Sequence, residues 1–266
     1  MALPESFVIK GIMAVHTADI ATNKEELYIN FPKTVNMENG EEMAFATGGI
    51  NNIQISAKKH SKTATGSVET PNFNLAQIGM MIGSSVNVGA GLVRITEIKT
   101  ITTNATITTH TAQGTAGSEI GFIQVLDANM NPTEELTQGA VIGAGVFTYT
   151  VGTKTITLNT SEVPDGTKVR ISYNATTDAT SKFISNSLTL FSANKKMYVD
   201  MIIEDLGGVE YLAQMYYPKA SIDGTFSMSV DNAGDPPTFT MNWTGLAGMS
   251  NTGLWELREY DASLMV

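Results

Sequence analysis

The residues with catalytic or metal-binding side chains are few and scattered in this chain. Its three histidines, His16, His60 and His110, lie far apart, and their spacing matches no metal-ligand motif. The pattern S-x-x-K occurs at Ser56–Lys59 and Ser192–Lys195, without the S-D-N and K-T-G elements that accompany it in β-lactamases. The sequence also lacks a phosphate-binding loop, H-E-x-x-H and G-x-S-x-G. We therefore expect no enzyme, no catalytic residues and no cofactor.

Two acidic turns have some of the oxygen ligands that calcium prefers. Asp127–Asn131 begins with D-x-N-x-N, but Pro132 replaces the required Gly and Gln138 replaces the final Glu of an EF-hand loop. Asp231–Asp235 also offers several oxygens, and the Pro236-Pro237 pair behind it is typical of an ordinary polar turn. We expect no metal site at either turn.

The composition is that of a folded, acidic protein. Of its 266 residues, 42% are hydrophobic and only 16% are charged, which excludes a chain that stays disordered for lack of apolar residues. The net charge is −10, so the chain has too few cations to grip nucleic acid phosphates tightly. The acidity either confers solubility alone or keeps a passing polyanion from adhering. The chain has no cysteine, which excludes disulfides and thiolate metal sites.

The amino terminus predicts neither a signal peptide nor a membrane span. Glu5 precedes a short apolar stretch, which Lys10 and Gly11 interrupt. Elsewhere the sequence has no run approaching the roughly 18 apolar residues that a spanning helix needs. We expect synthesis in a cytoplasm and no contact with a membrane.

Hydrophobic residues alternate with a period of two through most of the chain, which predicts strands. The candidate strands are Phe7–Val15, Glu26–Phe31, Ile50–Ala57, Thr63–Glu69, Leu92–Ile101, Ala105–His110, Ile120–Asp127, Val146–Val151, Thr155–Asn159, Lys168–Asn174, Ile184–Phe191, Met197–Glu204, Val209–Tyr217, Ser221–Asp231, Thr238–Thr244 and Leu254–Tyr260.

One segment, Asn72–Gly83, predicts a helix. It opens with capping-type residues, ends on a glycine, and places Phe73, Ile78, Met81 and Ile82 near one helical face. A helix of this length would cover one mouth or one face of a β-barrel or β-sandwich. The fold class that follows is all-β, a sandwich or barrel with one packed α-helix.

Residues 101–182 are predicted to form a separate β-subdomain that is inserted into the main fold. Short strands alternate here with turns such as Asp165-Gly166 and the tight hairpin Val151–Thr155. The main β domain then comprises residues 1–100 and 183–266, with the helix near residues 72–83. The alternative is that residues 101–182 continue one large sandwich.

The carboxy-terminal hairpin resembles the end of bacteriophage major tail proteins, the subunits of the tail tube. The resemblance is carried by Pro218–Gly224 and by Asp235–Met241, whose Asp-Pro-Pro turn joins two strands of alternating polarity. It extends upstream to a helix near Asn72–Gly83 that follows a long polar hairpin near Asn30–Gly49. The inserted segment resembles small β-modules that recur in phage structural proteins.

This resemblance implies a virion structural protein made in the cytoplasm of a bacterial host. Its copies would assemble into stacked rings, commonly hexameric, that form the tail tube through which DNA passes. The implied partners are further copies of the chain, and the tape-measure, tail-terminator and baseplate proteins. DNA would pass through transiently and without specific binding.

We predict that Asn30–Gly49 is a loop between rings; in a lone globular domain it would be a mobile loop. It is long and polar, and it ends on glycines, yet it contains Val35, Met37, Met43 and Phe45, which are our candidates for contacts between rings.

Two other functions remain open from the sequence. A decoration or adhesion module on the virion surface would bind carbohydrate or a host surface and would expose aromatic side chains on one face. Aromatic residues make up 8% of the chain, and its two tryptophans, Trp243 and Trp255, lie near apolar neighbours. The other alternative is an enzyme on a β-scaffold, for which no set of acid, base and nucleophile can be named.

Overall fold

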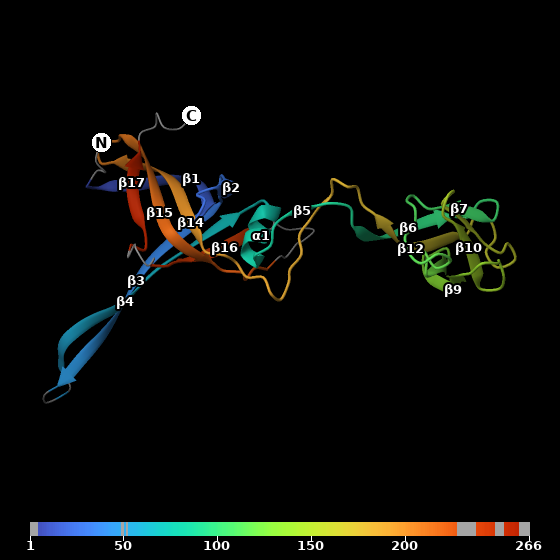
Figure 1. Ribbon diagram of the computed structural model, residues 1–266, viewed down its shortest axis with the longest axis horizontal. Coiled ribbons are helices and arrows are strands. Elements are labelled where there is room, and N and C mark those ends of the chain that lie inside the picture. The colour runs from blue at the N-terminus through green and yellow to red at the C-terminus, as the bar shows by residue number, and fades with distance from the viewer. Residues whose placement is uncertain (1–4, 49–50, 52, 228–237, 248–252, 261–266) are drawn as a thin grey trace. The chain divides into compact units, whose positions relative to one another are not determined.

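The chain folds into two units, each built on its own β-sheet (Figure 1). The computed structural model describes residues 5–48, 51, 53–227, 238–247 and 253–260. The first unit comprises Met1–Val86 and Ile184–Val266, and the second comprises Asn87–Phe183. Strands predominate and one helix is present in the described residues, which confirms the predicted all-β fold with a packed helix.

The first unit contains an eight-stranded antiparallel sheet. Seven of its strands follow the order β2-β1-β14-β15-β16-β4-β3, and β17 pairs with β15. Their bounds are β1 Phe7–Asp19, β2 Glu25–Asn30, β3 Thr34–Gly48, β4 Ile53–Thr70, β14 Lys195–Asp205, β15 Glu210–Ile222, β16 Phe239–Gly245 and β17 Glu256–Tyr260.

The two margins of this sheet are consecutive in the sequence. β2 forms one margin and β3 the other, and only residues 31–33 join them. The backbone N–H of Phe31 donates to Met13 of β1 at 3.2 Å, and that of Lys33 donates to Glu69 of β4 at 2.8 Å. So short a connection forces the sheet to curl into a nearly closed barrel around its core.

The core of the barrel follows from the alternation along each strand. On β14, Met197, Val199, Met201 and Ile203 point inward and are at most 1% exposed. The residues between them face away from the core. Trp243 of β16 contributes the largest buried side chain and packs edge-on against Tyr217, with ring centroids 6.0 Å apart.

The helix α1, Leu75–Ile82, covers one end of the barrel. The side chain of Asn74 caps it by accepting the Ala76 N–H at 2.9 Å, and Gly83 ends it in a left-handed conformation. Met80 and Met81 reach into the core beside strands β1 and β2. The helix is shorter than the predicted Asn72–Gly83, and Phe73 precedes it, 42% exposed and edge-on to Phe239.

The second unit is a seven-stranded sheet in the order β6-β12-β8-β9-β10-β11-β7 with its own core. It begins at residue 87, before the predicted boundary at residue 101, because β6 pairs with β12 along its whole length. The strands β5 and β13 pair where the chain enters and leaves this unit. Their bounds are β5 Asn87–Val88, β6 Leu92–Thr100, β7 Ala105–Ile107, β8 Phe122–Leu126, β9 Pro132–Gln138, β10 Val146–Thr150, β11 Thr155–Thr157, β12 Lys168–Thr176 and β13 Lys182–Phe183.

Several predicted elements differ from those in the structure. Ile184–Phe191 is not a strand, and the predicted loop Asn30–Gly49 is mostly strand β3, because it pairs in register with β4. β4 is continuous from Ile53 to Thr70 and so joins two predicted strands. Ile50 and the carboxy-terminal turn at 231–237 lie outside the described residues.

A substitution at Gly66 tests the packing of the barrel core. A Cβ at this position would lie 2.2 Å from the Trp243 ring, so Gly66→Ala must displace the indole. We expect a loss of about 1–3 kcal/mol in unfolding free energy, measured by denaturant titration. Gly11→Ala on β1 is the control, because a Cβ there meets nothing within 4 Å. Equal stability of the two variants would contradict this packing.

Glu97 of β6 anchors a hydrogen-bonded cluster in the second unit. Its carboxylate accepts bonds from the Thr109 backbone at 3.0 Å and from the Tyr173 hydroxyl at 3.0 Å, and it pairs with Lys99 at 3.2 Å. Burial by itself would raise the pKa of Glu97, but the bonds from Thr109, Tyr173 and Lys99 outweigh it and leave the pKa below its ordinary value.

This lowered pKa predicts how acid affects the second unit. A carboxyl whose pKa is lowered on folding stabilises the native state above its unfolded pKa, and the contribution disappears as the pH falls. Glu97→Gln should therefore lower the unfolding temperature at pH 7, and its deficit relative to the wild type should shrink towards pH 3. Calorimetry at both pH values measures the difference, and the exposed Glu134→Gln serves as control. A deficit that is constant with pH would refute the assignment.

Candidate assembly surface

Part of the β3–β4 hairpin extends beyond the sheet. β16 pairs with β4 only over Thr65–Thr70, so that β3 is the one strand paired with the preceding part of β4 in the described residues. We call this two-stranded part, Asn39–Gly48 with Ile53–Ala64, the distal ribbon. Figure 1 shows it projecting from the rest of the first unit.

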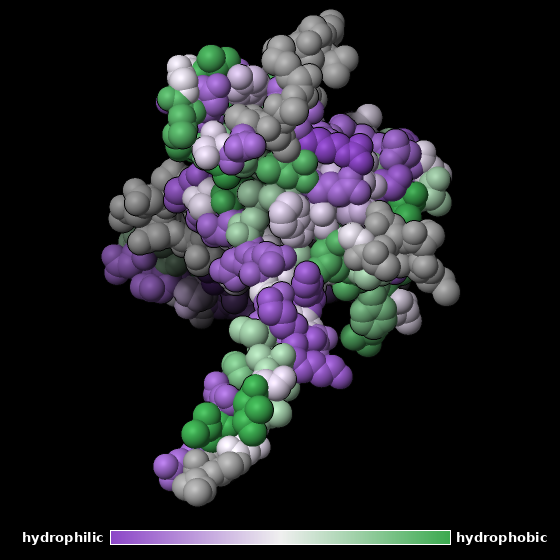
Figure 2. Space-filling model, turned by 90° about the vertical axis from the view of Figure 1, so that its left-hand side faces the viewer, coloured by the Kyte–Doolittle hydropathy of each residue, from purple (hydrophilic) through white to green (hydrophobic). Residues whose placement is uncertain are grey.

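The distal ribbon exposes large apolar side chains. Met43 is 48% exposed, Phe45 50%, Ile53 64% and Ile55 70%. Phe45 lies opposite Ala57 in the register and Met43 opposite Lys59, so Met43, Phe45, Ala57 and Lys59 share one face of the ribbon. Figure 2 shows hydrophobic side chains gathered along this part of the molecule.

The structure separates the four predicted contact residues into two pairs. Val35 and Met37 lie at the base of the hairpin, where they pack against the barrel core. Met43 and Phe45 lie on the distal ribbon and are exposed. Sequence reasoning missed Ile53 and Ile55 as contact residues, although the alternation in Ile53-Gln54-Ile55-Ser56 already indicated a strand with one apolar face.

Charged side chains flank the apolar face. Lys59 forms an ion pair with Glu41 at 2.7 Å, and His60 lies 3.4 Å from Glu42. The hydrogen bond from Lys59 lowers the pKa of Glu41 below its ordinary value. These pairs link β3 to β4 across the ribbon, which supplements the backbone ladder.

A two-stranded ribbon that is exposed to solvent has little stability by itself. A lone hairpin is marginally stable in water, and its two unpaired margins invite association with another chain. Natural proteins shorten or cover such edges, whereas this one extends the edge and places apolar side chains on it. The distal ribbon therefore has the properties of a surface that a partner covers.

A second unusual surface lies on the outer face of the barrel. Tyr28, His16, Tyr198 and Tyr216 occupy one cross-strand row over β2, β1, β14 and β15. His16 stacks on Tyr198 at 4.8 Å, and Tyr198 stacks on Tyr216 at 4.9 Å. The imidazole nitrogens of His16 lie 3.4 Å from Glu25 and 3.2 Å from Asp200. The row ties four strands together.

The structure does not bring the three histidines together. His16 lies on β1, His60 on β4, and His110 in the second unit, where its backbone N–H donates to the Tyr173 hydroxyl. Within the described residues, no three His, Asp or Glu side chains are grouped closely enough to hold a metal ion. No helix in that part of the chain is long and apolar enough to span a membrane.

Comparison with models of known protein families gives a match over most of the chain. A model of the YomU/Tube protein family matches residues 7–255, nearly the whole chain. The search of curated proteins found no significant match.

Hydrogen exchange tests whether the distal ribbon is a partner surface. In the dilute, unassembled chain, amides at residues 53–63 should exchange far faster than those of β14, because no packed core protects them. On self-association their exchange should slow to a rate near that of β14. The amides of β12 in the second unit provide an internal control whose exchange should not change. Slow exchange of the ribbon in a dilute monomer would argue against a partner surface.

Proposed function

The chain belongs to the YomU/Tube protein family, and we propose that its copies assemble into stacked rings that form the tail tube of a bacteriophage. The family match supports the resemblance to tail tube subunits and points to a structural role in a virion. The observation that carries the proposal is the distal ribbon, whose apolar face has no cover within the described part of its own chain. In an assembly, sister copies supply that cover.

Ring formation follows from the open margins of the sheet. β2 and β3 each have a hydrogen-bonded partner strand on one side only in the described residues. Closing a ring pairs or covers such margins all the way round, which leaves no free end to seed uncontrolled aggregation. Six copies per ring is the number that the resemblance to tail tube subunits implies.

Contacts between rings would come from the distal ribbon. It extends past the barrel, so its apolar face with Met43 and Phe45 would lie against the next ring. Val35 and Met37 would hold the base of the hairpin through their packing on the barrel core. Of the four predicted residues, Val35 and Met37 would thus anchor the hairpin, and Met43 and Phe45 would contact the next ring.

The net charge suits a conduit for DNA. A chain of net charge −10 offers phosphates little to bind, so DNA would pass through the lumen without adhering. The tape-measure protein inside the tube, and the terminator and baseplate proteins at its ends, complete the set of proposed partners. The chain would be made in the cytoplasm of the bacterial host before it joins the virion.

The alternative of a carbohydrate-binding surface module has less support. Trp243 is 1% exposed and so cannot form part of an open aromatic platform, and Trp255, which is 38% exposed, is a single ring whose indole N–H donates to Asn39. The four-ring row on β2, β1, β14 and β15 fits this alternative better, because it lies on the outer face and Tyr28 is 51% exposed, but its inner rings stack on one another.

The paired substitutions Met43→Asp and Phe45→Asp test the proposal. Both side chains are exposed, so the folded subunit should keep its unfolding temperature while long tubes disappear from negative-stain images. The control is Ala44→Asp with Ala46→Asp, which places the same charges on the opposite face of the same strand. Tubes of normal length from the Met43/Phe45 variant would contradict the assigned contact.

A further inference from the structure

The first unit has two chemically different ends, joined by strand β14. Lys195, the first residue of β14, lines a hollow beside α1, and Asp205, its last residue, begins the turn to β15. The 11 residues of the strand separate these ends by roughly 35 Å. Because successive strands of the sheet are antiparallel, β4 starts at the turn end. The distal ribbon and the turn therefore project from the same end of the barrel.

The turn end presents a rigid apolar projection. Asp205 accepts the backbone N–H of Gly207 at 2.8 Å and that of Val209 at 2.9 Å, which fixes the turn. The bonds from Val209 and Gly207 lower the pKa of Asp205, so its carboxylate stays charged and keeps accepting them at neutral pH. Leu206 at the tip is 83% exposed and Val209 is 52% exposed. Val8, opposite Glu204 on β1, adds a third exposed aliphatic group at this end.

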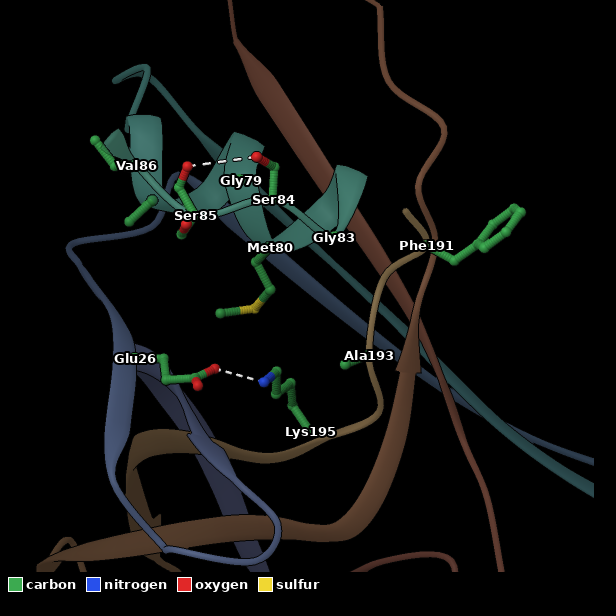
Figure 3. A pocket seen from close by; sticks show the side chains of 11 residues that line it. Glu26, Gly79, Met80, Gly83, Ser84, Ser85, Val86, Phe191, Ala193 and Lys195 are labelled. Carbon is green, nitrogen blue, oxygen red and sulfur yellow. Dashed lines mark hydrogen bonds and ion pairs between the residues drawn. The ribbon is translucent and has the colours of Figure 1, made fainter. Parts of the chain in front are cut away.

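The helix end presents a hollow of about 310 Å³. Ala76, Gly79 and Met80 of α1 line one side, and Ala193 and Lys195 line the other. Figure 3 shows Met80 pointing into this space and the Glu26–Lys195 ion pair, 2.7 Å long, across from it. The volume is near the lower bound of roughly 300 Å³ for ligand pockets, enough for an aliphatic side chain and its neighbours.

We propose that the Leu206 turn of one copy occupies the helix-end hollow of the next copy along the tube. This inference rests on the proposed function and names the surface that receives each ring. A projection and a hollow at opposite ends of one strand form a heterologous contact, which repeats in one direction and does not close on itself. A stack built this way has a polarity, with every turn end facing the same way.

The charges at the two ends favour this orientation. The turn end has an excess of carboxylates, with Glu204, Asp205 and Glu210 against Lys10. Two turn ends placed face to face would bring like charges together. At the helix end lysines balance the carboxylates, in the set Asp19, Lys24, Glu25, Glu26, Lys195 and Lys196. Turn-to-helix stacking therefore avoids the repulsion that two turn ends would suffer.

Two substitutions, one at each end, test this contact. Leu206→Asp removes the projection, and Ala193→Trp fills the hollow, with Ala76→Trp as a second way to fill it. Each variant should form single rings that do not stack, seen by electron microscopy and sedimentation velocity. Val141→Asp, at a 78% exposed aliphatic residue of the second unit, should leave tube formation unchanged.

Mixing preformed rings makes the test specific. Leu206→Asp rings keep the hollow and Ala193→Trp rings keep the projection, so an equal mixture should yield pairs of rings and nothing longer. Tubes of normal length from either variant would overturn the contact, as would a mixture that remains single rings. Rings that form and stack through other residues would refute this inference alone, whereas a wild-type chain that forms no rings would refute the proposed function as well.

Discussion

Backbone hydrogen bonding at the margins of one sheet constrains everything else in the first unit. Each strand margin presents N–H and C=O groups that need partners, and the three-residue connection between β2 and β3 brings both margins to one side of a barrel. The connection bonds to β1 and β4, yet it leaves the longer margin of β3 without a second partner strand in the described residues. In the proposed assembly, another copy of the chain completes this margin.

The burial of apolar side chains along β4 also depends on which strands lie beside it. Where β4 has β16 beside it, the alternate residues Val68 and Thr70 are buried. Where β16 ends, the same strand continues with Ile53 and Ile55 in solvent. In the proposed tube, the energetic gain from burying such side chains, about 25 cal/mol per Å² of apolar surface, would come on assembly instead of on folding. Under this proposal, folding of the barrel and assembly of the tube would use different parts of one hairpin.

Local patterns in the sequence predicted most of the strands and the helix, since period-two alternation and capping residues act over a few neighbours. Asn74 and Gly83 bound the helix through such short-range bonds. The pairing of β3 with β4 was missed because the polar run 38–42, with Gly40 at its centre, interrupts the apolar alternation that Val35 and Met37 begin and Met43 and Phe45 continue. The exposure of Phe45 depends on where β16 ends, and the position of Leu206 depends on how the chain turns after β14. Both are features of the tertiary structure, which local sequence patterns do not encode.

The most direct test of this account is a cryo-electron microscopy reconstruction of the assemblies formed by the purified full-length chain. The account predicts rings in which neighbouring copies cover the β2 and β3 margins and the apolar face of the distal ribbon, with every ring facing the same way. Single copies with both margins bare and Phe45 in solvent, at concentrations where tail tubes assemble, would contradict it.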